Sequence, residues 1–591
     1  MKISLLVLPF RNWSSSKQDD FLCDGITEEL IYTLTRLDHL QVASRTSSFF
    51  FKEKNLQPKQ IGEQLGISHM LEGSIRRYDE KIRINIHLTD VDTGFTVWSE
   101  SFNRPYQDLL SLQDDIATFV AQKFSEQQTP APSIQSDLVP NNDVNAYELY
   151  LQGLYHYNQY TMDEMEKAVA CCKQALVRQP DFALAYALIA SCSVALGGYI
   201  HPRYYQIAKK TAFKAIQLNA SLIEPHLSIA MVKAFYDYDW PGAMGSIQQA
   251  LQLDIRSAEA LRMKGIMEII MGQGEKSIYS HEMATKYDPM NTLFINSQGW
   301  ALDYSGRFEA ARREYLRTLD IDPNFRPAME SLGFSFVFEG KWEEAEHWLL
   351  RYQAAVGHPL KGWFGLGYLY GKMQLVDKAY QVLEIHNQRQ AEDPRENLAL
   401  DYALVYLGLG DKQKALSFLK QAVDSHHIWT IARLGIDPIF HELHTEKGYW
   451  QLMDRLKLTP YYREGKTLET GKSSPLLVIQ SDTKEKLEVL LSELLYVEAQ
   501  GNYTKFVYLD GLDIQERLLR IPLSAVKDKI DSENIIHCHR SYLANINFFN
   551  SLSGSSRQLN LLCKQTATKL PISRNKEALV KRTLADFGAQ E

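Results

Sequence analysis

A 34-residue spacing in the middle of the chain is the strongest constraint on its fold. Asp254, Asp288 and Asp322 lie 34 residues apart, and the last two are each followed by a proline. A fixed period of this length indicates a row of short supersecondary units, each of which buries its apolar face against the next. A proline ends the second helix of a unit because it cannot donate the next backbone hydrogen bond. The period therefore predicts a helical solenoid.

Small residues recur at fixed places inside the unit. Before Pro323, Gly299 lies 24 residues upstream, Ala311 lies 12 upstream and Tyr315 lies 8 upstream, and small residues at such places let two helices approach closely. Similar sets place further units: Gly333 with Ala345 and Pro359, Ala168 with Ala175, Ala208 with Ala215, Ala243 with Ala250, Gly265 with Ala284, Gly367 with Ala379, and Ala415 with Ala422. About eight units result. The pattern resembles the tetratricopeptide repeat (TPR) family, which implies a right-handed superhelix whose concave face holds a peptide or partner protein.

Two other features of this region have alternative interpretations. Five aromatic residues either line the concave groove or pack between repeats, and we favour packing: Trp300, Trp342, Trp348, Trp363 and Tyr368. Four histidines suggest a metal site: His426, His427, His441 and His444. Adjacent helical positions point apart, and no carboxylate or cysteine completes a ligand set at a suitable spacing. We expect neither a metal nor a cofactor.

Two stretches rich in Pro, Ser, Thr or Gly divide the 591-residue chain, which is too long for one hydrophobic core. They are linkers at 126–144 and 459–475. The predicted domains are therefore 1–125, 145–458 and 476–591. We expect a multidomain protein with an α+β N-terminal domain, an all-α solenoid and a mostly-β C-terminal domain.

The first region alternates strand-like and helix-like runs. Strands are predicted over 3–10 and near 40–44, and helices over about 27–37 and 61–65. In KIRINIHLTD every second residue is apolar, which is typical of a half-buried strand. Turn-type sequences separate this run from its neighbours, and they predict an antiparallel meander closed by a helix over about 108–124.

The same region carries the string VLPF, DGITEEL, SRTSSFF, LEGSIRR and TGFTVWSESF. This string resembles the TolB amino-terminal-like domain over about 120 residues, which implies a sensing or protein-interaction module. Asp19, Asp20 and Asp24 suggest a metal or phosphoacceptor site. A solvated loop with a helix cap is the interpretation that we favour.

From residue 476 onward the pattern changes to short β-branched, aromatic or leucine-rich runs separated by turn residues, such as Gly501-Asn502 and Asp510-Gly511. Helices are expected over about 522–530 and after Ser573. The ordered motifs ELLYVEAQGNYTKFVYLDG, LSAVKDKI, HCHRSYLANI and LPISRNKEALVKRTL resemble the LytTR (LytR/AlgR-type) DNA-binding family along nearly its full length. Family members have ten short strands and insert loops, rather than a recognition helix, into successive major grooves.

The matching loops supply side chains that suit base and phosphate recognition. We predict the following DNA-binding residues: Asn502, Tyr503, Lys505, His539, Arg540, Arg574, Asn575, Lys576, Lys581 and Arg582. Arg540 and Arg574 are expected to read base edges. The resemblance implies a third base contact from Asn502 or Tyr503, with Lys505, Lys576, Lys581 and Arg582 on the backbone. Lys576, Lys581 and Arg582 fall in a basic run from Lys564 to Arg582.

Charge and cysteines limit the alternatives. The net charge of −8 restricts DNA contact to a local surface, and the six cysteines form no CxxC pair. A redox switch between Cys538 and Cys563 is one interpretation, and two buried strand residues is the one we favour. No run of 18 apolar residues suggests a membrane span, so we expect a cytoplasmic protein.

These features predict a bacterial transcriptional regulator rather than an enzyme. It would bind promoter DNA, as paired copies on direct repeats, and take its signal through a partner on the repeats; a homodimer is compatible with that use. One alternative is a TPR adaptor without DNA binding. Another is a nucleotide cyclase, because similar N-terminal and repeat regions occur beside cyclases, but the three regions leave little room for a cyclase domain and neither GxxxxGK[ST] nor GxGxxG is present.

Overall fold

The computed structural model describes residues 3–124 except 15, 17–18, 36, 38–39, 53, 55 and 79; residues 143–462 except 395; and residues 476–588 except 482–484, 492–493, 511–512, 531–534, 547, 550, 556–557 and 564–567. Contacts divide it into two compact units, Met1–Thr470 and Gly471–Glu591. Most of both predicted linkers lies outside the described residues. The first four residues of the second one form helix α23 (Thr459–Tyr462), because Tyr462 packs against the repeats.

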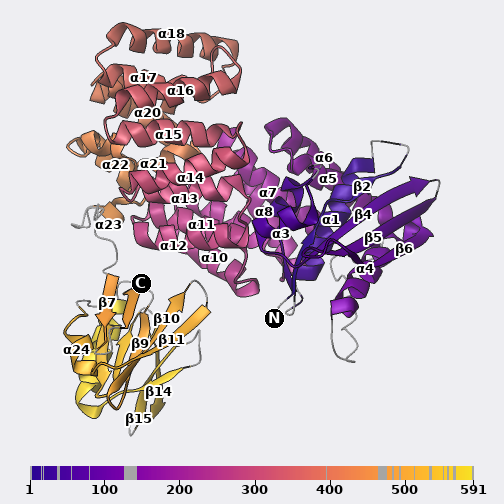
Figure 1. The fold of residues 1–591 in the computed structure, drawn as a ribbon. Helices are drawn as coiled ribbons and strands as arrows, with labels where there is room; N and C mark the ends of the chain where they lie inside the picture. Colours follow the sequence, from indigo (N-terminus) through magenta and orange to yellow (C-terminus); the bar gives the residue numbers. More distant parts are fainter. Residues whose placement is uncertain are drawn as a thin grey trace. The chain divides into compact units, whose positions relative to one another are not determined.

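The N-terminal part of the first unit is a mixed sheet covered by helices (Figure 1). Its strands are β1 (Ile3–Val7), β2 (Arg11–Asn12), β3 (Leu40–Val42), β4 (His69–Tyr78), β5 (Lys81–Asp90) and β6 (Thr96–Pro105). The order is β3-β1-β4-β5-β6, with β1 parallel to β3 and β4. The predicted antiparallel meander is present as β4, β5 and β6. Ile82, Ile84 and Ile86 are fully buried, as their alternation requires.

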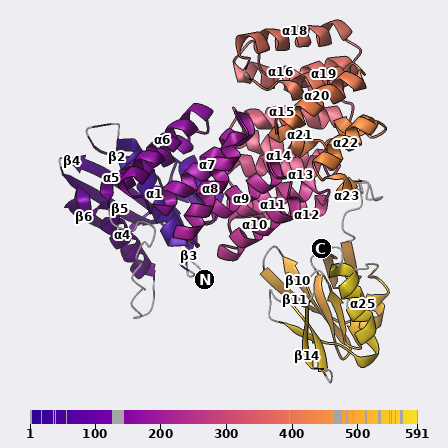
Figure 2. The ribbon, with the colours of Figure 1, turned by 180° about the vertical axis from the view of Figure 1, so that it is seen from behind.

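In the part of this region that the structure describes, four α-helices accompany the sheet: α1 (Asp20–Thr35), α2 (Arg45–Phe50), α3 (Pro58–Leu65) and α4 (Leu109–Phe124). Helix α1 begins well before the predicted start at Thr27 because Leu22 and Ile26 extend its buried stripe toward the N-terminus. Helix α2 was not predicted. In the views of Figures 1 and 2, α1 lies beside α5, the first helix of the repeats, and the two helices are in contact.

Eight consecutive helix pairs follow among the described residues, which agrees with the predicted solenoid. They are α5 (Val144–Tyr157) with α6 (Met162–Arg178), α7 (Ala183–Tyr199) with α8 (Arg203–Leu218), α9 (Glu224–Phe235) with α10 (Trp240–Leu253), α11 (Ala258–Ile270) with α12 (Gly274–Tyr287), α13 (Thr292–Asp303) with α14 (Phe308–Ile321), α15 (Arg326–Phe338) with α16 (Trp342–Val356), α17 (Phe364–Lys372) with α18 (Val376–Glu392), and α19 (Ala399–Gly408) with α20 (Lys412–Asp424). Short helices α21 (Ile428–Arg433), η3 (Pro438–Leu443), α22 (Lys447–Arg455) and α23 end the unit.

The small residues of the repeat pattern allow these helices to pack closely. All twelve alanines in the predicted sets are fully buried. A methyl group on Gly299 would lie 2.3 Å from the Tyr315 ring of the paired helix, well inside contact distance. The spacing seen in the sequence is therefore a packing pattern.

The described residues of the second unit form ten strands, the number that the LytTR resemblance implied. They are β7 (Leu476–Gln480), β8 (Lys486–Leu490), β9 (Leu494–Gln500), β10 (Tyr503–Asp510), β11 (Asp513–Leu519), β12 (Ile535–His539), β13 (Tyr542–Asn545), β14 (Ser551–Ser555), β15 (Gln558–Leu562) and β16 (Lys569–Pro571). The main sheet has the order β11-β10-β9-β13-β12. Helix α24 (Leu523–Lys527) is shorter than predicted, and α25 (Glu577–Gly588) ends the described chain (Figure 2).

Candidate nucleic-acid interface

Two turns of the main sheet lie side by side at one end of the second unit. The first turn joins β9 to β10 through Gly501 and Asn502, and Gly501 has a φ of +65°, a conformation that suits glycine. The second joins β12 to β13 through Arg540 and Ser541. The backbone N–H of Ala499 donates to the carbonyl of Ser541 at 2.8 Å, and this bond holds the two turns together.

A third segment reaches the same end of the sheet. The backbone N–H of Ser573 donates to the carbonyl of Cys538 at 3.0 Å, which places the start of η4 (Arg574–Lys576) beside the end of β12. The structure thus brings together three loops that lie more than 30 residues apart in the sequence. Their exposed members among the predicted residues are Asn502, Tyr503, Arg540, Arg574 and Asn575.

His539 is held inside this group rather than pointing freely into solvent. Its Nδ1 accepts the backbone N–H of Ser541 at 3.3 Å, and its ring lies 5.8 Å from the ring of Tyr542. Partial burial, and then the charge of Arg540, lower the pKa of His539 below its usual value. The imidazole is therefore neutral at pH 7 and offers hydrogen bonds rather than charge.

Two of the predicted phosphate contacts already have carboxylate partners. The Nζ of Lys505 lies 2.8 Å from Glu516 on β11, and this interaction raises the pKa of the lysine. The Nζ of Lys581 lies 2.6 Å from Glu577, one turn earlier on α25. Lys576 is partly buried, and Arg582 is exposed. Lys564, which begins the predicted basic run, lies outside the described residues.

The structure adds one cation that our sequence analysis did not select. Lys527, at the end of α24, is exposed. Its charge and that of Lys576 both lower the pKa of His537, after the larger effect of burial. Lys527 belongs to the motif LSAVKDKI, which the sequence analysis identified. It was not predicted as a DNA-binding residue because it is far in sequence from the three loops.

The two cysteines of this unit are both buried. Burial raises the pKa of Cys538 to about 12, so its thiol is protonated and unreactive at neutral pH. Cys563 belongs to the same hydrophobic cluster. These facts favour the structural interpretation over a redox switch.

Comparison of the chain with known protein families supports this description of the second unit. The model of the LytTr DNA-binding domain family matches residues 484–585. Residues 484–585 form a LytTR domain. The solved LytTR DNA-binding domain of a Bacillus cereus protein is 18% identical, covers 19% of this chain and 98% of its own length, and has a TM-score of 0.16.

The rest of the chain has similarities of a different kind. A TPR protein from Thermus thermophilus is 13% identical and covers 36% of this chain and 100% of its own, with a TM-score of 0.28. A Rhizobium meliloti (strain 1021) protein named "Putative adenylate cyclase 3" is 28% identical over 236 residues, which are 39% of this chain. The match spans only 40% of that relative's length. The resemblance of residues 1–125 to the TolB amino-terminal-like domain stays a prediction.

The last residues of the first unit pack back against the repeats. Residues 426–462, here called the closing segment, contact both first and second helices of several repeats. The ring of His426 stacks on Tyr236 and Tyr238 at 4.9 and 5.4 Å, and Trp429 meets Trp300 edge-on at 5.2 Å. The closing segment therefore covers part of the surface of several repeats.

Further contacts hold the closing segment against the repeats. Trp240 Nε1 donates to the carbonyl of Leu456 at 2.8 Å, and Tyr462 Oη donates to the carbonyl of Ile270 at 2.7 Å. Eight of its apolar residues are fully buried: Ile431, Leu434, Phe440, Leu443, Tyr449, Met453, Leu456 and Leu458. Each contributes about 1.5–3 kcal/mol by burial, so a peptide would not easily displace them. For five aromatic residues the sequence allowed either a place in the groove or packing between repeats. All five lie in or against hydrophobic clusters.

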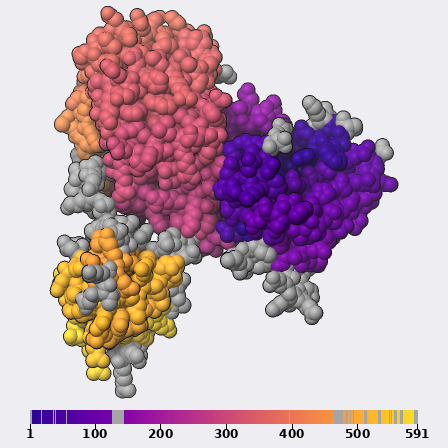
Figure 3. All heavy atoms as spheres, viewed as in Figure 1, coloured from indigo at the N-terminus to yellow at the C-terminus, as the bar shows by residue number. Residues whose placement is uncertain are grey.

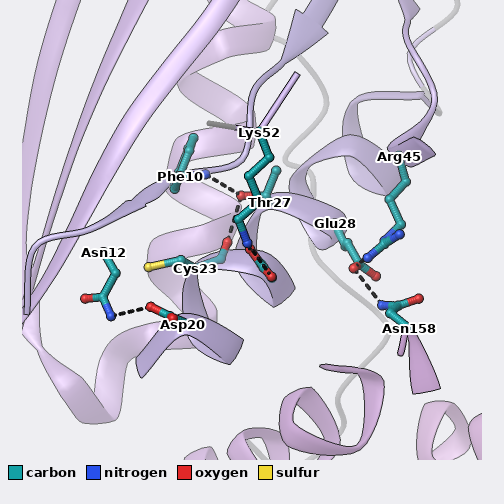
Figure 4. Close-up of polar contacts among 10 residues, drawn as sticks. Phe10, Asn12, Asp20, Cys23, Thr27, Glu28, Arg45, Lys52 and Asn158 are labelled. Carbon is teal, nitrogen blue, oxygen red and sulfur yellow. Dashed lines mark hydrogen bonds and ion pairs between the residues drawn. The ribbon is translucent and has the colours of Figure 1, made fainter. Parts of the chain in front are cut away.

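The acidic residues near the N-terminus are engaged in local contacts (Figure 4). Asp24 is buried within α1 and forms an ion pair with Lys52 at 2.6 Å, while Asn12 donates to Asp20 at 2.7 Å. Glu28 pairs with Arg45 at 2.5 Å and accepts from Asn158 of the repeats at 2.9 Å. Asp24 is therefore not in the solvated loop that we expected, because α1 begins four residues before it.

Polar contacts also connect this N-terminal part with a later repeat. Ser47 of α2 donates to Asp288, the residue that follows α12, at 3.0 Å, and Asn291 donates to Thr46 at 3.2 Å. The space-filling view shows the N-terminal part lying directly against the repeats (Figure 3).

Among the described helices, none is long and apolar enough to cross a lipid bilayer.

Proposed function

We propose that this chain is a sequence-specific DNA-binding transcriptional regulator whose LytTR domain contacts promoter DNA. The observation that carries the proposal is the meeting of three loops at one end of the main sheet, with Arg540 and Arg574 both exposed there. Guanidinium groups make bidentate hydrogen bonds to guanine, and loops of this kind fit the major groove. Arg540 and Arg574 read base edges, and Asn502 or Tyr503 makes the third base contact.

The cations around the loops hold the phosphate backbone. Lys576 and Arg582 take this role, with Lys505 and Lys581 contributing to the extent that DNA phosphates replace Glu516 and Glu577. His539 and Asn575 supply uncharged hydrogen-bonding groups next to the arginines. Because the net charge of the chain is negative, this local group, rather than the whole surface, attracts the duplex.

The remaining regions provide the input. A protein or peptide partner binds the repeats on a surface that the closing segment leaves open, and the N-terminal part contributes sensing or a second contact. The three-domain division at 1–125, 145–458 and 476–591 and a role without catalysis are parts of the same proposal. Binding of paired copies to direct repeats would match the use of two LytTR domains on one promoter.

The proposal is tested by selecting bound duplexes from a random-sequence library with the full chain. We expect enrichment of one motif whose affinity falls steeply with salt, by about 0.9 in the log-log slope for each neutralised phosphate. A library that shows no enriched motif, together with salt-independent binding, would instead favour a TPR adaptor without DNA binding.

A catalytic alternative has one supporting observation, the name of the Rhizobium meliloti relative. That name includes a cyclase activity, but the match covers only 40% of the relative. An assay for cyclic AMP formed from ATP by the full chain distinguishes the two functions. Turnover above that of a heat-denatured sample would overturn the non-enzymatic part of the proposal.

A further inference from the structure

Strand β6 is a long free edge of the N-terminal sheet. The sheet order ends in β6, which pairs with β5 and with no other described strand. Its ten residues are each exposed or only partly buried. An edge of this length has a row of backbone N–H and C=O groups open to another strand. The opposite edge, β3, is only three residues long.

Edge strands of natural sheets are usually protected by charged side chains, and β6 has two charged residues of opposite sign. Glu100 and Arg104 are both exposed and lie four residues apart. They pair with Ile86 and Ile82 of β5, which places both side chains on the same face of the sheet as Phe102 between them. Within the described part of the chain, Arg104 forms an ion pair with Asp115 on α4, at 3.9 Å.

This charge pattern is complementary to a second copy of itself. In an antiparallel pair of two β6 strands centred on Phe102, Glu100 of each copy stands opposite Arg104 of the other. The two-fold axis would then be perpendicular to the sheet, so both side chains stay on one face, and directly opposite residues lie about 4.5–5.5 Å apart. A shift of two residues in either direction removes both pairs, and centring on Glu100 places like charges together. Only one register therefore satisfies both charges.

We propose that two copies of this chain associate through β6, with Phe102 at the two-fold axis and two Glu100–Arg104 pairs across it. Residues 99–105 of each strand form the shared ladder, which Pro105 ends because it lacks an N–H. The two sheets join into one continuous sheet. The association concerns the first unit and does not require DNA binding.

Charge reversal in the full chain tests the register. The wild-type protein should show a concentration-dependent shift toward the dimer mass in sedimentation equilibrium without DNA. Glu100→Arg and Arg104→Glu should each weaken association at least tenfold, because each places like charges opposite one another. The double variant Glu100→Arg/Arg104→Glu should restore it. Glu63→Arg, the same charge reversal at an exposed site on α3, serves as the matched control and should leave association unchanged.

A second measurement does not depend on charge. The variant Ser101→Cys/Asn103→Cys places thiols opposite one another across the axis, and mild oxidation should give a covalent dimer. Ser99→Cys/Asn103→Cys, which is out of register, should give much less. A wild-type chain that stays monomeric at all concentrations, or a dimer that neither charge reversal weakens, would overturn the proposal. Neither result would bear on whether the LytTR domain binds DNA.

Discussion

Lys505 and Glu516 form an ion pair across neighbouring strands, with 2.8 Å between Nζ and Oε1. The lysine side chain is 20% exposed, whereas the glutamate is 56% exposed. A cation that sequence analysis assigned to the DNA backbone is therefore compensated in the free protein. Any phosphate contact by Lys505 must compete with this carboxylate.

Removal of the carboxylate should strengthen DNA binding. We expect Glu516→Gln to raise affinity several-fold at low salt and to steepen the log-log salt slope by about 0.9, because Lys505 then neutralises one more phosphate. Fluorescence anisotropy over a salt series measures both quantities. In the double variant Lys505→Ala/Glu516→Gln the steeper slope should disappear, and its persistence would show that Lys505 does not contact phosphate.

The arginines and the lysine of α25 should behave differently. We expect Arg540→Ala and Arg574→Ala each to weaken binding to the selected duplex by about 1–3 kcal/mol and to relax sequence preference, since a base contact is lost. Lys581→Ala should weaken binding to selected and random duplexes about equally. Competition binding with both duplexes provides the measurement. Equal losses on the two duplexes for all three variants would contradict the assigned base contacts.

The repeat packing predicts contrasting effects of two glycine substitutions. Gly299→Ala should lower the free energy of unfolding by about 1–3 kcal/mol, because its methyl group would lie 2.3 Å from the Tyr315 ring. Gly245→Ala is the matched control, since Gly245 is also helical and nothing lies within 4 Å of its added methyl group. Alanine there should be neutral or stabilise by up to about 1 kcal/mol. Thermal unfolding followed by circular dichroism compares them, and similar melting temperatures would count against close packing at Gly299.

Histidine burial predicts that acid destabilises the first unit. His427 caps α21 by accepting the Thr430 N–H at 3.3 Å, and burial, followed by the charge of Arg433, lowers its pKa to about 4. Because the unfolded chain binds this proton more readily, the stability that this group contributes is complete above pH 6.5 and falls as the pH drops toward 4. The loss from this group is at most about 3 kcal/mol.

The variant His427→Asn isolates this contribution. Asparagine also caps helices but does not titrate in this range, so the decline in stability between pH 6.5 and 4 should be smaller than in the wild type. Denaturant unfolding at a series of pH values measures the difference. Other buried histidines, such as His281 and His386, remain in both proteins and act as an internal control. Identical pH profiles would mean that folding does not lower the pKa of His427.

Periodic features were accessible from the sequence. The 34-residue spacing and its buried alanines defined the repeats because a close helix contact admits only small side chains. The alternation of apolar and polar residues in KIRINIHLTD likewise identified a half-buried strand. Four motifs in the expected order identified the LytTR domain. Most of the side chains that the structure brings together could be predicted because they lie in the loops of these motifs.

The tertiary structure alone decided which residues from distant segments meet. Nothing local in the sequence relates Lys505 to Glu516, Lys527 to His537, or Trp240 to Leu456. These contacts depend on strand register and on the path by which the closing segment returns along the repeats. Local propensity and period act over a few residues, whereas such pairings are set by burial and hydrogen bonding between segments as many as 245 residues apart.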